Sequence, residues 1–167
     1  MEREPIMAQS QKTENKIVII GAPKCGQNSL LKYYKSIGKD VTRIEEIFKE
    51  DGVARYEKEF ADRKPVLILR DNIDRIWSNY NFFGYKDSMT LKEYLKYDKP
   101  HNVIGEGNPV KQGRYQYWIN KWKDHDLEIV YLEDLQKLEG FPHENSTKLN
   151  TPMTDKDRVM IKEAVTQ

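Results

Sequence analysis

The sequence predicts an α/β fold, namely a single three-layer domain in which helices flank a parallel sheet of about four to five strands. Short runs of β-branched and aliphatic residues alternate along the chain with segments whose apolar residues recur at helical spacing. The length of 167 residues suits one hydrophobic core and is short for two. We therefore expect one domain over residues 16–167, preceded by a disordered polar lead over residues 1–15.

Three runs are typical of buried strands, because polar or turn residues bound each of them, and a fourth run has a weaker strand pattern. In chain order they are "KIVII" (16–20), "DVTRI" (40–44), "PVLIL" (65–69) and "LEIVYL" (127–132), the second having the weakest pattern. In parallel sheets the ligand lies at the carboxyl ends of the strands. The residues just after these four runs are therefore the place to search for a site.

Helical spacing of apolar residues follows or separates these strands. The predicted helices cover residues 30–37, a charged segment that ends near 62, and residues 71–83, 90–97, 112–123 and 154–165. Gly38 ends the first of them, and "TDKD" from Thr154 caps the last. Residues 84–111 form the longest irregular segment.

Charge and cysteine content limit the function classes. Lys and Arg number 28 against 27 Asp and Glu, so no overall field favours nucleic acid or a membrane as a partner. The single cysteine, Cys25, excludes an internal disulfide and a zinc cluster of several thiolates. No apolar run has the length of a membrane span or a signal-peptide core, and we expect a cytoplasmic protein.

The segment "GAPKCGQNS" (21–29) connects the first strand to the first helix. A strand, a glycine turn and a helix start form an anion site, because backbone N–H groups and the helix dipole converge there. A Walker A loop places lysine directly after its second glycine and a hydroxyl next. Here Gln27 follows Gly26 and the lysine, Lys24, comes earlier, which favours an anion whose transfer requires no metal. The alternative is a plain turn in which Lys24 is a solvated surface residue.

Three segments in the same order resemble the sulfotransferase family. "PKCGQNSLL" resembles the signature Pro-Lys-x-Gly-Thr-Thr-x-Leu, and "VLILRDNIDRIWSNY" resembles Leu-Arg-Asp-Pro-x-x-Arg-x-x-Ser-x-Tyr. "GRYQYWINKWKDHDLEIVYLEDL" is similar to the later Gly-x-Tyr helix and its strand, where the Gly-x-Tyr element shapes the pocket. The resemblance implies a P-loop NTPase-like sulfotransferase fold and the donor 3′-phosphoadenosine 5′-phosphosulfate (PAPS). It also implies the product adenosine 3′,5′-bisphosphate, no metal, and a hydroxyl or amine acceptor on a small molecule or carbohydrate.

The resemblance also implies which residues bind the donor. The residues around its 5′-phosphosulfate are Lys24, Cys25, Gly26, Gln27, Asn28 and Ser29. Lys24 lies over the leaving oxygen, and Arg70 and Ser78 hold the 3′-phosphate. An ion pair between Arg70 and Asp71 or Asp74 is the structural alternative.

A base must take the acceptor's proton. In this family it is a histidine or a glutamate, and the glutamate lies just beyond the second strand, before an aromatic. "TRIEEIF" offers Glu45 and Glu46 there, and the spacing favours Glu45, with His101 as the next candidate. Both glutamates could equally be solvated residues that open a helix.

The sequence also departs from the family pattern. Gln27 and Asn28 replace the two threonines, and Asn72 replaces the proline after Arg-Asp. The basic loop that covers the nucleotide has only "HENSTKLNTP" (143–152) in its place. Arg75 is expected to be exposed or paired within its helix.

Because of the departures from the family pattern, two alternatives to a sulfotransferase stay open. One is a nucleotide-binding module with impaired catalysis, and the other is a P-loop kinase with a degenerate loop.

Overall fold

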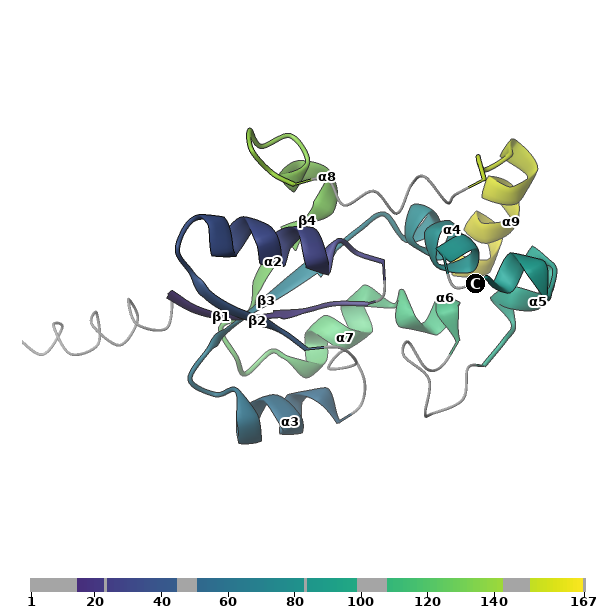
Figure 1. The fold of residues 1–167 in the computed structure, drawn as a ribbon. Helices are drawn as coiled ribbons and strands as arrows, with labels where there is room; N and C mark the ends of the chain where they lie inside the picture. Colours follow the sequence, from purple (N-terminus) through teal and green to yellow (C-terminus); the bar gives the residue numbers. More distant parts are fainter. Residues whose placement is uncertain are drawn as a thin grey trace, which may run out of the picture.

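Parallel strands form the central sheet of the protein (Figure 1). The structure is a computed structural model that describes residues 15–22, 24–44, 51–82, 84–98, 108–142 and 151–166. Within these ranges the sheet has four strands, in the order β2 (Asp40–Arg43), β1 (Lys16–Ile20), β3 (Lys64–Leu69) and β4 (Glu128–Tyr131). The predicted α/β class and the four predicted strands are confirmed.

The two inner strands owe their apolar sequences to burial on both faces. β1 pairs in parallel with β2 and β3, with Ile17 opposite Val41 and Ile20 opposite Leu67. The last four residues of β1 are buried, as are all residues of β3 after Lys64. Continuous runs of this kind are expected where helices cover both sides of a parallel sheet.

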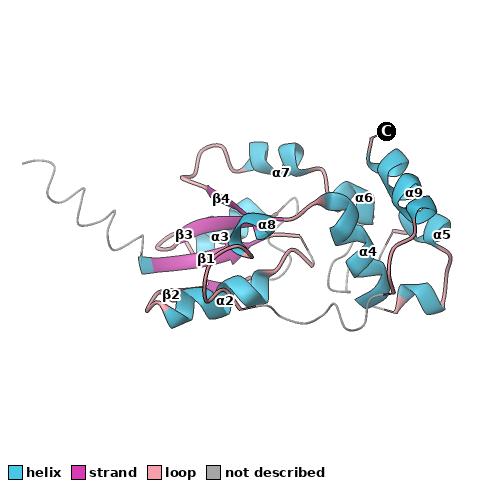
Figure 2. Cartoon of the chain, turned by 90° about the horizontal axis from the view of Figure 1, so that it is seen from above, coloured by secondary structure: helices cyan, strands magenta, loops and turns pink. Residues whose placement is uncertain are grey.

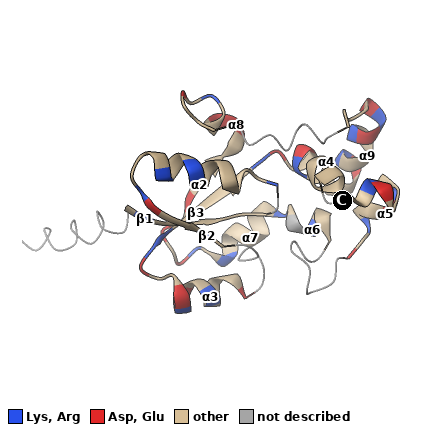
Figure 3. Cartoon of the chain, viewed as in Figure 1, with Lys and Arg blue, Asp and Glu red and all other residues tan. Residues whose placement is uncertain are grey.

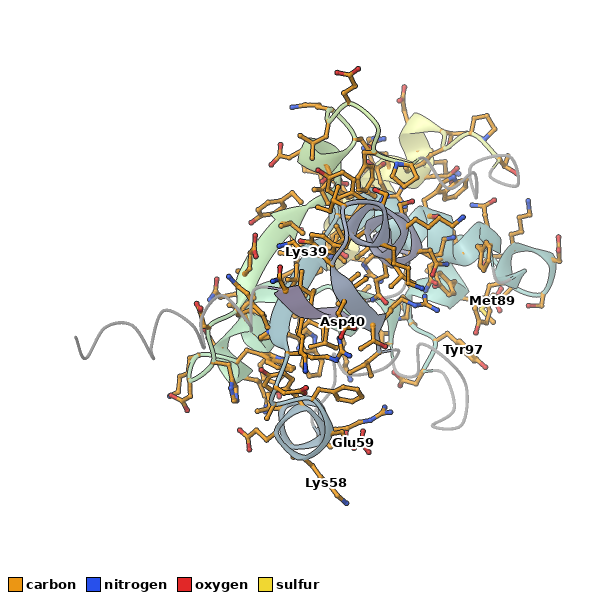
Figure 4. All side chains as sticks on the ribbon, turned by 60° about the vertical axis from the view of Figure 1, so that its left-hand side comes forward. Lys39, Asp40, Lys58, Glu59, Met89 and Tyr97 are labelled. Carbon is orange, nitrogen blue, oxygen red and sulfur yellow. The ribbon has the colours of Figure 1, made fainter. Side chains whose placement is uncertain are left out.

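Helices lie on both faces of the sheet. Figure 1 shows α2 (Gln27–Ser36) on one face, and α3 (Gly52–Glu59) and α7 (Tyr115–Lys121) on the other. Tyr56 of α3 is buried, and its ring centroid lies 5.3 Å from that of Trp122. Lys58 points away from the sheet (Figure 4). The charged sequence of α3 therefore has one face that packs and one that meets solvent.

A second group of helices lies beyond the carboxyl ends of the strands, as Figure 2 shows from above. It consists of α4 (Asn72–Phe82), α5 (Leu91–Leu95), α6 (Pro109–Gln112) and α9 (Asp155–Val165). These helices have their own hydrophobic cluster, in which Ile76, Tyr94 and Ile161 are fully buried. The predicted search region, at the carboxyl ends of the strands, therefore faces this second group of helices.

Several short elements differ from the prediction. Residues 84–111 contain η1 (Tyr85–Asp87), α5 and α6, and α8 (Leu132–Leu135) follows β4. Elements of three to five residues are too short for a periodic pattern to reveal. The helix predicted over 112–123 begins only at Tyr115. The predicted cap of the last helix is confirmed, because Thr154 Oγ1 accepts a hydrogen bond from the N–H of Asp157.

Charged residues of both signs occupy the surface helices α3, α5 and α9 (Figure 3). This distribution agrees with the net charge of +1. Among the helices that the structure describes, none is both long and apolar enough to cross a membrane.

Candidate functional site

The loop between β1 and α2 makes a tight turn at the carboxyl edge of the sheet. Lys24 and Gly26 have φ angles of 65° and 90°, both left-handed, and Gly26 is the N-cap of α2. A Cβ on Gly26 would lie 2.6 Å from Cδ1 of Leu132, the first residue of α8. Glycine is therefore required for conformation and for space. The left-handed φ of Lys24 is a strained conformation for a residue with a side chain.

This turn directs the N-terminus of α2 toward the carboxyl edge of the sheet. The ten-residue helix has no acidic side chain in its first turn and no side-chain cap. Its first backbone N–H groups have no partner within the helix, and they carry the positive end of its dipole. The loop and α2 can therefore bind an anion.

The side chains of the loop divide into buried and exposed ones. Cys25 has no exposed surface, and burial raises the pKa of its thiol, with the cationic Arg75 partly opposing the shift. Cys25 can therefore contribute to an anion site only through its backbone. Gln27 is largely buried beside Gly21. A Cβ added to Gly21 would lie 3.0 Å from Gln27 Nε2. Ser29 is buried and Asn28 is exposed.

Lys24 is held at both its backbone and its side chain. Arg70 Nη1 donates a hydrogen bond to the Lys24 carbonyl oxygen, at 3.0 Å. The Lys24 ammonium lies over the ring of Phe82, 3.6 Å from its centroid. Two of the predicted site residues, Lys24 and Arg70, are thus in direct contact although 46 positions separate them.

Arg70 itself is fixed by Tyr115. The Tyr115 hydroxyl donates to the Arg70 carbonyl oxygen at 2.7 Å. Burial, and next the proximity of Cys25, raise the pKa of Tyr115, so its hydroxyl stays protonated and remains a donor. The tyrosine of the Gly-x-Tyr element therefore positions the arginine that follows β3. This contact places the N-terminus of α7 beside the loop.

Ser78 lies two turns into α4 with only 1% of its surface exposed. Within the described residues, its Oγ has no hydrogen-bond partner, and the same holds for Arg75 Nη1 and Asn79 Oδ1. Residues three and four apart share a face of a helix. Buried polar atoms without partners are rare in proteins and need an explanation. The three atoms lie on one face of α4, which is buried and contacts α5 through Asn79 and α6 through Arg75.

Of the two alternatives expected for Arg75, exposure or pairing within its helix, the structure shows the second. Its side chain is fully buried; Nε and Nη2 bond to Asn72 Oδ1 at 3.0 and 2.9 Å, so it is paired within its own helix. Nη2 also donates to the Pro109 carbonyl at 2.6 Å, which ties α4 to α6. A Cβ on Gly113 would collide with the Asn72 amide. Asn72, where the family pattern has proline, is thus the acceptor for a buried guanidinium.

The signal for this arrangement was present in the sequence. Asn72 and Arg75 are three apart on α4, the spacing at which side chains of a helix meet. Gly113 is the glycine of the Gly-x-Tyr element. The structure shows why residue 113 has no side chain: the Asn72 amide occupies the position where a Cβ would lie.

The candidate bases Glu45, Glu46 and His101 lie outside the described residues. The chain that leads to the two glutamates leaves β2 beside β1, because the N–H of Ile44 donates to the Ile19 carbonyl at 3.2 Å. Residues 143–150 of the expected covering loop also lie outside the described ranges.

The geometry brings together Lys24, Gly26 and Arg70, with Ser78 farther along α4. No model of a known protein family matches this chain, and a search of curated proteins finds no match. The function therefore has to be argued from the residues themselves.

Proposed function

We propose that this protein is a sulfotransferase that moves the sulfuryl group of PAPS to a hydroxyl or amine acceptor. The hydrogen bond between Arg70 Nη1 and the Lys24 carbonyl carries the proposal. It joins the two segments that resemble the 5′ and 3′ parts of a PAPS site, at the sheet edge where such a ligand is expected. The sulfotransferase type of the α/β fold is part of the same proposal.

The residues present fit a nucleotide with phosphates at both ends. Backbone N–H groups of Gly26, Gln27, Asn28 and Ser29 at the start of α2 would bind the 5′-phosphate. The Arg70 guanidinium would bind the 3′-phosphate together with Ser78, whose buried Oγ has no partner among the described residues. A ligand oxygen would supply the hydrogen bond that this hydroxyl lacks.

PAPS supplies an activated sulfuryl group, and the protein's task is to hold the reactants in line and to stabilise charge. The acceptor oxygen or nitrogen forms a bond to sulfur as the bond from sulfur to the bridging oxygen breaks. Lys24 stabilises the negative charge that develops on this leaving oxygen. The acceptor's proton goes to Glu45 or Glu46, which lie two and three residues after the end of β2.

Transfer of radiolabelled sulfate from PAPS to a panel of phenols, amines and oligosaccharides tests this proposal. We expect label on at least one acceptor class, and its loss in Lys24→Ala. A protein that binds adenosine 3′,5′-bisphosphate but labels no acceptor would instead be a nucleotide-binding module. Gln27 favours that second candidate, since it packs beside Gly21 where the sulfotransferase signature has a threonine hydroxyl. Tight binding of magnesium ATP, with no preference for a 3′-phosphate, would indicate the kinase.

A further inference from the structure

The side chain of Lys24 ends on an aromatic ring. Its ammonium nitrogen lies 3.6 Å from the centroid of Phe82, well inside the distance at which a cation is attracted to the face of a ring. Phe82 is the last residue of α4, and 44% of its surface is exposed. This contact joins the last residue of α4 to the loop between β1 and α2.

The two contacts of Lys24 come from the two ends of one structural unit. Arg70, which fixes the Lys24 carbonyl, lies two residues before α4 begins, and Phe82 closes the helix. The backbone contact fixes where the lysine side chain starts, at a residue already held in a left-handed conformation. The flexible side chain still has many rotamers, and the ring selects among them.

We propose that Phe82 is a positioning residue for Lys24. Its ring holds the ammonium beside the anion loop, so that the lysine does not have to be ordered during the reaction. The catalytic role of the lysine rests on the proposed function, whereas the contact between the two side chains does not. Phe82 acts through Lys24 and needs no contact with the reacting atoms.

Three variants test the contribution of the aromatic face of Phe82. Phe82→Leu keeps an apolar side chain and removes the aromatic face, and Phe82→Trp keeps an aromatic face that attracts cations more strongly. Tyr117→Leu is the matched control, because Lys121 lies over the Tyr117 ring at 5.0 Å in an exposed pair on α7. It removes a lysine–aromatic contact outside the proposed site.

The contact is tested by NMR of the ε-methylene protons of Lys24, assigned by their loss in Lys24→Arg. Protons over a ring face are shifted upfield. We expect an upfield signal in the wild type, in Phe82→Trp and in Tyr117→Leu, and its return to the usual lysine position in Phe82→Leu. A Lys24 signal that does not respond to Phe82→Leu overturns the proposal, whether or not the protein transfers sulfate.

The positioning role is tested by turnover. We expect Phe82→Leu to lower kcat about five- to tenfold, with the donor KM within about twofold, and Phe82→Trp to restore kcat. An unchanged kcat in Phe82→Leu overturns the positioning role even if the NMR contact is present. If the protein neither binds the nucleotide nor transfers sulfate, the proposed function and the catalytic role of Lys24 are contradicted. The NMR experiment then still tests whether Lys24 contacts Phe82.

Discussion

Arg70 holds the backbone of Lys24: its Nη1 donates to the Lys24 carbonyl oxygen at 3.0 Å. The residue after β3 therefore fixes the conformation of the loop after β1. Tyr115 in turn holds the Arg70 carbonyl, at 2.7 Å. A chain of contacts thus runs from α7 through Arg70 to Lys24.

Arg70→Ala should weaken the binding of adenosine 3′,5′-bisphosphate by about 10- to 100-fold, because hydrogen bonds to charged groups contribute about 1.5–3 kcal/mol. Isothermal titration calorimetry measures this loss. Arg55→Ala is the control, since Arg55 pairs with Glu59 on the exposed side of α3. Equal affinities for Arg70→Ala and the wild type would show that Arg70 serves only the loop backbone.

Ser78→Ala should lower the affinity for adenosine 3′,5′-bisphosphate without lowering the stability of the fold. The Ser78 hydroxyl is buried and has no partner among the described residues, so its removal should leave the urea midpoint unchanged or raise it. Affinity for the bisphosphate should fall about tenfold, the value of one hydrogen bond to a charged group. Ser36→Ala, which removes a hydroxyl exposed on α2, should change neither. A less stable Ser78→Ala protein with full affinity would assign the hydroxyl a structural role.

Asn72→Ala should destabilise the fold by about 2–4 kcal/mol, because the buried Arg75 guanidinium loses the acceptor for two of its hydrogen bonds. Gly113→Ala should also be destabilising, since its methyl group would collide with the Asn72 amide. Urea denaturation of both single variants and the double variant measures the coupling. Gly113→Ala should lower the free energy of unfolding less in the Asn72→Ala background than in the wild type. Purely additive losses of unfolding free energy would contradict this packing.

Glu45→Gln and Glu46→Gln should differ in activity. Removal of a general base lowers kcat by about 10²- to 10⁴-fold, whereas a solvated glutamate contributes little. We expect one of the two variants to lose turnover on this scale while it keeps nucleotide affinity. Similar and full activity in both variants would direct the search for the base to His101.

Stability should fall as the pH rises from 10 to 12, in part through Tyr34. Burial, with the Glu128 carboxylate and Tyr33 adding to it, raises the pKa of Tyr34 from 10 to about 12. Between these values the unfolded state loses the phenol proton and the folded state keeps it, so ionisation favours unfolding. Urea midpoints across this range should fall less steeply for Tyr34→Phe than for the wild type. Tyr117→Phe, at an exposed position, should follow the wild type.

The strands were predictable because burial on both faces leaves a continuous apolar run. β1 has the predicted bounds 16–20, and β3 begins one residue earlier than expected. Four-residue helices such as α6 depend on a cap rather than on a period: Asn108 accepts the N–H groups of Val110 and Lys111, and Pro109 follows the cap. Such local bonds leave little trace in a hydrophobic pattern.

The sequence proposes the members of the candidate site, and the structure adds a contact between two of them, Lys24 and Arg70. The strand-end rule and the resemblance named Lys24, Arg70 and Ser78. Nothing in the sequence indicated that Arg70 bonds to the Lys24 backbone, or that Lys24 lies on Phe82. The pairing of Arg75 within its helix was among the expectations, but its full burial was not, because an arginine on a helix is usually exposed. Contacts between distant segments depend on how α4 packs against its neighbours, and the hydrophobic pattern of a sequence does not reveal that packing.

The proposed 3′-phosphate site is tested by comparing the binding of adenosine 3′,5′-bisphosphate with that of ADP, which lacks the 3′-phosphate. We expect the bisphosphate to raise the thermal midpoint without magnesium, and ADP to raise it much less. Ser78→Ala should narrow the difference between the two ligands. A protein that the bisphosphate does not stabilise, or that ADP stabilises equally well, would contradict the assignment of Arg70 and Ser78 to a 3′-phosphate.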